Sequence, residues 1–107
     1  MKHKILYLLI ILFFISNTLS SQQHNGGIKG IVRNEANEPL PFVTVIIESL
    51  KVGTTTDERG HYELSLQEGS YAIKYSFVGY ITESREVNIA NSVKTIDVMM
   101  KTDSKML

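Results

Sequence analysis

Cysteine is absent from the 107-residue sequence, and neither sign of charge dominates, because eleven basic residues balance eleven acidic ones. Without cysteine, we expect no disulfide in an exported domain and no lipid-anchored lipoprotein. Charges of both signs are interspersed, so the sequence has no basic patch suited to nucleic acid and no polybasic run suited to an anionic membrane. We therefore expect a solvated surface of mixed charge.

A long hydrophobic run is also missing, because the apolar stretch at residues 5–15 is about half the ~20 residues that a membrane-spanning helix needs. A short basic head precedes this stretch, and a polar segment with small residues follows it. This order is typical of a secretory signal peptide. We predict a helical signal peptide at residues 1–21, with cleavage after Ser20 or Ser21. A retained membrane anchor is the alternative.

The chain that remains after export is long enough for one small domain. Removal of the signal peptide takes away two lysines, which leaves nine basic and eleven acidic residues and a net charge of about −2. We predict a disordered polar leader at residues 22–27, a domain at residues 28–101 and a linker-like tail at residues 102–107.

Short alternating segments fill this domain, and no helical period is visible. The clearest alternation lies between Ser70 and Val78, and Gly79 then interrupts it as a bulge or bend would. Seven strands spaced by roughly ten residues predict an all-β fold, a seven-stranded antiparallel β-sandwich. The predicted strands are residues 28–33, 42–48, 54–56, 61–67, 70–78, 81–89 and 93–101.

The apolar sides of these strands should form the core. An alternative for the aromatic row Tyr71, Tyr75, Phe77 and Tyr80 is stacking against carbohydrate. Three of these four residues share the side that we expect to be buried, so core packing is the better interpretation and only Tyr80 is a candidate for exposure. The predicted core consists of Ile28, Val32, Val43, Val45, Ile47, Tyr62, Leu64, Leu66, Tyr71, Ile73, Tyr75, Phe77, Ile96 and Val98.

A four-residue turn is predicted where Asp57 and Gly60 occupy the first and last positions. Aspartate at the start accepts a hydrogen bond from the backbone two residues on, and glycine at the end tolerates positive φ. We predict that this turn closes a hairpin between residues 54–56 and 61–67. Calcium binding is the alternative for the same acidic turn, but Arg59 stands where an oxygen ligand would be needed.

We find no catalytic constellation in the sequence. The mature chain has two histidines, His24 in the leader and His61 at the start of a predicted strand, where we expect it to face solvent. A Ser-His-Asp arrangement built from Asp57 and His61 would lack a nucleophile elbow and an oxyanion hole. The segment with Gly26, Gly27 and Gly30 is too short and too strand-bound to be a phosphate loop. We therefore predict no enzyme activity and no catalytic, cofactor-binding or metal residue.

Four pieces of sequence, in this order and spacing, resemble a known family. They are the I-x-G-x-V start at residues 28–32, EPLPFVTV at 38–45, TTTD followed by GHY at 54–62, and SFVGY at 76–80. Together they resemble the carboxypeptidase-regulatory-like domain over residues 28 to 100. The SFVGY form behind a signal peptide is most similar to the version at the N-terminus of TonB-dependent outer-membrane receptors of the starch-utilisation type.

The resemblance implies a transthyretin-like (prealbumin-like) sandwich of seven strands in two sheets. It also implies a non-catalytic periplasmic module, placed before the plug and barrel of a receptor that imports oligosaccharides, peptides or metal chelates. No cofactor is implied, and the implied partners are periplasmic or outer-membrane proteins of an import complex. The sequence stops where such a receptor would continue, so we expect a truncated frame or fragment.

Two alternatives to a receptor module stay open. One is a stand-alone periplasmic binding or adhesion domain, in which an edge strand accepts a strand from a partner. Residues 28–33 or the final strand are the candidates for such an edge. The other alternative is an accessory domain of a secreted peptidase, which depends on the family name alone.

Overall fold

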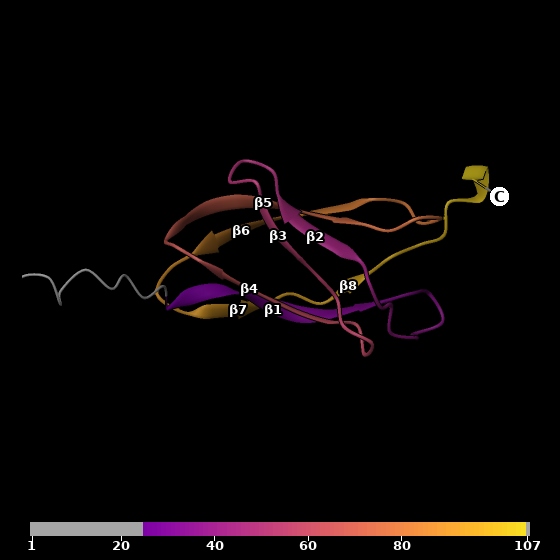
Figure 1. The fold of residues 1–107 in the computed structure, drawn as a ribbon, viewed down its shortest axis with the longest axis horizontal. Coiled ribbons are helices and arrows are strands. Elements are labelled where there is room, and N and C mark those ends of the chain that lie inside the picture. The colour runs from indigo at the N-terminus through magenta and orange to yellow at the C-terminus, as the bar shows by residue number, and fades with distance from the viewer. Residues whose placement is uncertain (1–24, 107) are drawn as a thin grey trace, which may run out of the picture.

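The computed structural model describes residues 25–106, which fold into a sandwich of two β-sheets (Figure 1). One sheet has the strand order β4-β1-β7, with β8 also paired to β1, and the other has the order β3-β2-β5-β6. The all-β, two-sheet prediction is confirmed. The predicted signal peptide at residues 1–21 lies outside the described residues. The elements are β1 (Gly26–Arg33), β2 (Thr44–Ile47), β3 (Val52–Thr55), β4 (His61–Leu66), β5 (Gly69–Ser76), β6 (Glu83–Ile89), β7 (Val93–Thr95), β8 (Val98–Met99) and the 3-10 turn η1 (Ser104–Met106).

Strand β1 lies in the middle of its sheet, so the prediction that residues 28–33 form an edge is wrong. It pairs with β4 in antiparallel fashion on one side and with β7 and β8 in parallel fashion on the other. The other sheet is antiparallel throughout. The parallel pairs were not expected; they arise because the last segment enters this sheet beside the first strand and runs in the same direction. Neighbours on both sides use the backbone groups of β1.

The turn from Asp57 to Gly60 is present, but the predicted hairpin around it is wrong. Strand β3 pairs with β2, and β4 pairs with β1, so the turn carries the chain from one sheet to the other. The backbone N–H of Val32 donates to the carbonyl oxygen of Gly60 at 2.9 Å, which attaches the turn to β1. Alternation and turn residues predict a chain reversal, but they do not identify the partner strand.

The predicted final strand at residues 93–101 is divided into β7 and β8 by Ile96 and Asp97. At the break, an Asp97 carboxylate oxygen accepts a hydrogen bond from the backbone N–H of Ile31 at 2.9 Å. The carboxylate takes the place of a carbonyl oxygen that a regular strand would supply, so a donor of β1 keeps a partner.

The core lies between the two sheets and contains most of the predicted residues. Four predicted members, Leu64, Tyr71, Phe77 and Ile96, are only partly buried and pack against it. The prediction missed the inward side of β6, because that side carries charge at one end and apolar residues at the other. The buried core consists of Ile28, Val32, Leu40, Val43, Val45, Ile47, Tyr62, Leu66, Ile73, Tyr75, Val87, Ile89, Val98 and Met100.

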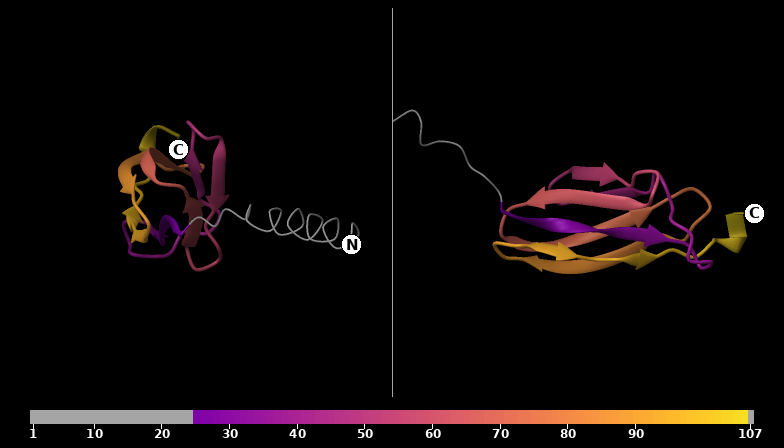
Figure 2. Two further views of the ribbon diagram at one scale, coloured as in Figure 1. Left: turned by 90° about the vertical axis from the view of Figure 1, so that its left-hand side faces the viewer. Right: turned by 90° about the horizontal axis from the view of Figure 1, so that it is seen from below.

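The domain boundaries differ slightly from the predicted ones. Gly26 and Gly27 belong to β1, where they oppose Leu66 and Ser65, so the prediction of disorder is wrong for these two glycines. At the other end, the tail begins beside the domain, because Thr102 forms a bridge with Tyr80. Strand β1 begins at one end of the sandwich and the C-terminal η1 lies beyond the opposite end (Figure 2).

Candidate functional site

The carboxylate of Asp57 is used to hold its turn. One oxygen accepts hydrogen bonds from the backbone N–H groups of Arg59 and His61, each at 2.9 Å. The bond from His61 is the main cause that lowers the pKa of this carboxyl. Gly60 completes the turn at φ 77°. A carboxylate that is ionised and already accepts two backbone hydrogen bonds is a poor general base. His61 is exposed, as predicted. Within residues 25–106, no three potential His, Asp or Glu ligands gather around a metal position.

A shallow depression next to this turn is lined by residues of β1, β3, β4 and β7 and by Asp97. Its lining is mainly polar and charged, and the one aromatic residue in it, Tyr62, is buried with its ring in the core. Carbohydrate sites depend on exposed aromatic faces, so this surface offers no stacking platform for a sugar. The lining residues are Lys29, Gly30, Ile31, Thr54, Thr55, Asp57, His61, Tyr62, Glu63, Thr95 and Asp97.

Two buried tyrosines connect the sheets in the centre of the sandwich. The hydroxyl of Tyr62 donates to the carbonyl oxygen of Ile96 at 2.6 Å and lies 2.8 Å from the hydroxyl of Tyr75. Because Tyr62 has one hydroxyl proton, the bond between the two hydroxyls is donated by Tyr75. Their rings meet edge to face at a centroid distance of 5.6 Å. Burial raises the pKa of both hydroxyls, so they stay neutral.

Gly30 makes room for this tyrosine pair. A Cβ atom on Gly30 would collide with the carbonyl oxygen of Ile96 and would lie 3.1 Å from a ring carbon of Tyr62. The glycine of the I-x-G-x-V piece therefore has a packing role. We call Gly30, Tyr62, Tyr75 and Ile96 the central network.

The aromatic row does not form an exposed platform. Tyr75 is fully buried, and Tyr71 and Phe77 are partly buried against the core. Tyr80, the candidate for exposure, is also partly buried, because its ring packs on Phe77 at a centroid distance of 5.7 Å. Core packing is therefore the role of this row.

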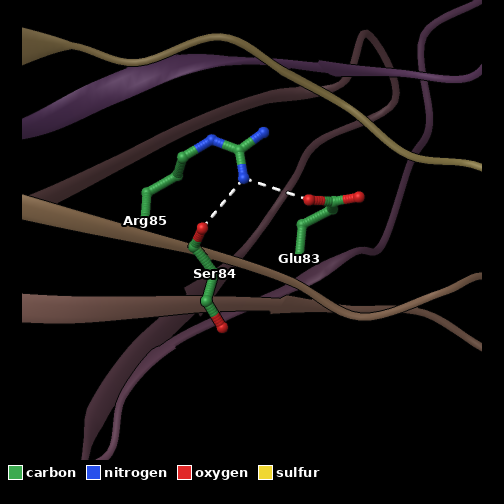
Figure 3. A network of polar contacts seen from close by, with 3 residues as sticks. All are labelled: Glu83, Ser84 and Arg85. Carbon is green, nitrogen blue, oxygen red and sulfur yellow. Dashed lines mark hydrogen bonds and ion pairs between the residues drawn. The ribbon is translucent and has the colours of Figure 1, made fainter.

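Two sheet edges, β6 and the predicted edge at the final strand, give little support to strand addition. On the edge strand β6, the Arg85 guanidinium donates to a carboxylate oxygen of Glu83 at 3.0 Å and to the carbonyl oxygen of Ser84 at 2.8 Å (Figure 3). A charged pair and an occupied carbonyl oxygen discourage an incoming strand there. The final strand, which was predicted as a candidate edge, is divided into the short β7 and β8.

An unusual turn precedes β2 and was missed by the sequence prediction, which placed Phe42 inside a strand. Buried Thr56 fixes this turn: its hydroxyl donates to the carbonyl oxygen of Leu40 at 2.6 Å and accepts from the backbone N–H of Val43 at 2.9 Å. The backbone N–H of Phe42 donates to the carbonyl oxygen of Thr56 at 3.0 Å. Phe42 has φ 63° and is 64% exposed.

Two more exposed apolar residues lie at the same end of the sandwich. Val78, at the tip of the turn between β5 and β6, is 87% exposed, and Ile81 is 47% exposed. Thr44 and Ser76 are partners across the antiparallel strands β2 and β5. Phe42, two residues before Thr44, and Val78, two residues after Ser76, therefore lie at the same end of this strand pair. We call Phe42, Val78 and Ile81 the apolar end.

The C-terminal segment runs along the apolar end. The backbone N–H of Ile81 donates to the carbonyl oxygen of Lys101 at 2.8 Å, and that of Asp103 donates to the carbonyl oxygen of Gly79 at 2.9 Å. Polypeptide that leaves the domain therefore starts beside these exposed residues. The helical segment η1 is three residues long, and no helix within the described part of the chain has the length or apolar character to cross a bilayer.

Comparison with known proteins places these features in a family. Residues 28–107 match the model of the CarboxypepD_reg-like domain. The chain is 34% identical over 99 residues to TonB-dependent receptor P39 of Formosa agariphila, which covers 92% of this chain and 9% of that receptor. It is 32% identical over 104 residues to TonB-dependent receptor SusC of Bacteroides thetaiotaomicron, covering 97% of this chain and 10% of the receptor.

The chain thus spans about a tenth of the length of the two receptors. A cohesin–X-dockerin complex from Acetivibrio cellulolyticus contains a similar fold, with a TM-score of 0.61 at 16% identity over 72% of this chain and 58% of that one. The matching family is regulatory-like and these relatives are receptors, not enzymes. The chain belongs to the family of CarboxypepD_reg-like domains.

Proposed function

We propose that this chain is a non-catalytic periplasmic module that stands N-terminal to the plug and barrel of a TonB-dependent outer-membrane receptor. One observation carries the proposal: nearly the whole chain matches two such receptors, each about ten times longer than the matched region. The fold supports the same role, because β1 begins at one end of the sandwich and the C-terminal segment leaves at the other. A module with this arrangement fits in line ahead of a second domain.

Periplasmic location is tested by expressing the full chain with a C-terminal epitope in a Gram-negative host. We expect the protein in the fraction released by osmotic shock, shortened at its N-terminus after Ser20 or Ser21, as intact mass and N-terminal sequencing would show. Recovery of the uncleaved chain in the cytoplasm would contradict the proposal. Recovery of the uncleaved chain in the inner membrane would support the retained anchor instead.

Membership of a receptor is tested at the level of the gene. We propose that the chain is a receptor fragment, so the coding sequence downstream of Leu107 should specify a plug and a barrel, in frame or out of frame. Unrelated or intergenic sequence there would contradict the fragment and favour a stand-alone domain. The transcript across this junction shows whether the two parts are expressed together.

A further inference from the structure

We infer that the apolar end, formed by Phe42, Val78 and Ile81, docks an apolar stretch of the receptor polypeptide that follows this domain. The inference rests on the proposed function, because it takes the partner to be the rest of a receptor. It adds a binding surface and a kind of partner to that function.

The backbone of Phe42 is the first reason. A non-glycine residue at φ 63° is strained, and such strain persists only where the surroundings impose it. Thr56 imposes it through its bonds to the turn. The other two described non-glycine residues with positive φ, Asn37 and Lys51, are polar residues in exposed turns, whereas Phe42 is a large apolar residue that is 64% exposed. The domain gains little burial from holding this ring outward.

The neighbours of Phe42 are the second reason. Single exposed apolar residues are common on protein surfaces and need no explanation. The two most exposed large apolar residues in the described part of the chain, Val78 at 87% and Phe42 at 64%, both lie at this end, whereas Leu50, Val52 and Val93, elsewhere in the sandwich, are 39–47% exposed. Val78 occupies the tip of a turn, where a polar residue would serve the fold equally well. Exposed apolar residues that gather at one place mark contact sites.

The partner follows from the size and the position of the surface. Three side chains are far fewer than the ~20 residues that each partner contributes to a standard interface, so a freely diffusing protein would be held poorly. A tethered segment needs less contact, because the tether raises its local concentration. The C-terminal segment is hydrogen-bonded to the backbone of Gly79 and Ile81, so receptor polypeptide that follows this segment would start beside the apolar end.

Cysteine labelling tests this inference, because the chain has no cysteine of its own. Val78→Cys reports on the apolar end, and Leu50→Cys, 47% exposed in the turn between β2 and β3, reports on the opposite end. Each variant is made in the full chain alone and in a chimera, where the full chain replaces the matching region of SusC. Both proteins are purified in the same detergent, and the rate of maleimide labelling at each position is read by peptide mass spectrometry.

We expect labelling at position 78 to be about tenfold slower in the chimera than in the chain alone, which corresponds to a site docked for about nine tenths of the time. Labelling at position 50 should change less than about twofold. Adding Phe42→Asn should restore fast labelling at position 78. Asparagine tolerates the left-handed backbone, and a thermal melt of the same variant checks that the domain still folds.

Three results would overturn the inference: equal rates at position 78 in both proteins, equal slowing at positions 50 and 78, or slowing that Phe42→Asn leaves unchanged. Slowing at position 78 that grows with concentration in the chain alone would identify a second copy as the occupant and would also overturn it. The chimera is purified for labelling from whichever cell fraction contains it, so the labelling result does not depend on where the chimera is located. A chimera that never reaches the outer membrane would count against the proposed function, whereas unprotected Val78→Cys counts only against docking.

Discussion

The central network and the apolar end both contain residues that are unusual for their positions. Only those of the central network add packing and hydrogen bonds to the domain itself. At Gly30, the missing side chain lets Tyr62 reach the carbonyl oxygen of Ile96 and hold Tyr75. At Phe42, a strained backbone holds a ring toward solvent. An unusual residue that gives the domain packing or hydrogen bonds serves folding, whereas one that gives the domain neither points to a binding partner. Substitutions in the two regions should therefore affect different measurements.

Gly30→Ala should have the largest effect on stability. Its Cβ atom would meet the backbone carbonyl oxygen of Ile96, which cannot swing aside as a flexible side chain would. We expect a loss of about 3 kcal/mol or more in the free energy of unfolding. Urea denaturation measures it, with Gly79→Ala as a control, because open space surrounds Gly79 and only its φ of 86° is strained. The control should lose about 1 kcal/mol; equal losses would contradict the packing role of Gly30.

Thr56→Val should come next. It keeps the shape of the side chain but leaves the carbonyl oxygen of Leu40 and the backbone N–H of Val43 without their partner. Two buried groups at about 1–3 kcal/mol each predict a loss of about 2–3 kcal/mol, allowing for relaxation of the turn. Thr56→Ser retains the hydroxyl and should lose about 1 kcal/mol for one methyl group. Chemical denaturation of both variants is the measurement, and similar losses would show that the clamp depends on packing instead of these bonds.

Tyr62→Phe should cost more than Tyr75→Phe. The first removes the bond to Ile96 and the acceptor for Tyr75, whereas the second removes only the donor to Tyr62. We expect losses of about 1–3 and 0.5–1.5 kcal/mol respectively, from the cost of unmet and lost hydrogen bonds. Thermal denaturation of the two variants gives the order. A reversed order would contradict the stabilising role of the bond from Tyr62 to Ile96.

Alkaline pH should weaken the central network in the wild-type protein. The pKa of Tyr62 and Tyr75 is raised from the ordinary value of 10.0 by burial, so above pH 10 the unfolded chain binds fewer protons than the folded one. The contribution of the two tyrosines to stability is therefore fully present below pH 10 and is lost as the pH rises above 10. Denaturation at several pH values measures the slope, which Tyr75→Phe should reduce; an unchanged slope would contradict the assignment.

Much of this fold could be predicted from local patterns. The alternation around Ile73 and Tyr75 correctly identified a strand with one buried side, and Asp57 with Gly60 correctly identified a turn. These signals act over a few residues. The partner of each strand depends on contacts between distant segments, which explains why β3 and β4 were wrongly paired with each other.

The apolar end could not be predicted for the same reason. The backbone of Phe42 is set by Thr56, fourteen residues later, and the β-forming residues after Phe42 favoured a strand through it. Asp97 is a similar case, because its carboxylate completes the bonding of β1 from 66 residues away. A proline-rich segment before an apolar residue was the available signal for an irregular turn at Phe42.

Phe42→Asn should have the smallest effect on stability, and it tests the comparison most directly. Phe42 is 64% exposed, so little burial is lost, and asparagine adopts positive φ more readily than phenylalanine. We expect the free energy of unfolding to stay the same or to rise by up to about 1 kcal/mol. Phe42→Ala loses the same ring without easing the backbone, so it should be less stable than Phe42→Asn. Thermal melts of the full chain rank the three proteins. If Phe42→Asn loses more than about 1 kcal/mol, the ring stabilises the domain itself, and the contrast between the apolar end and the central network disappears.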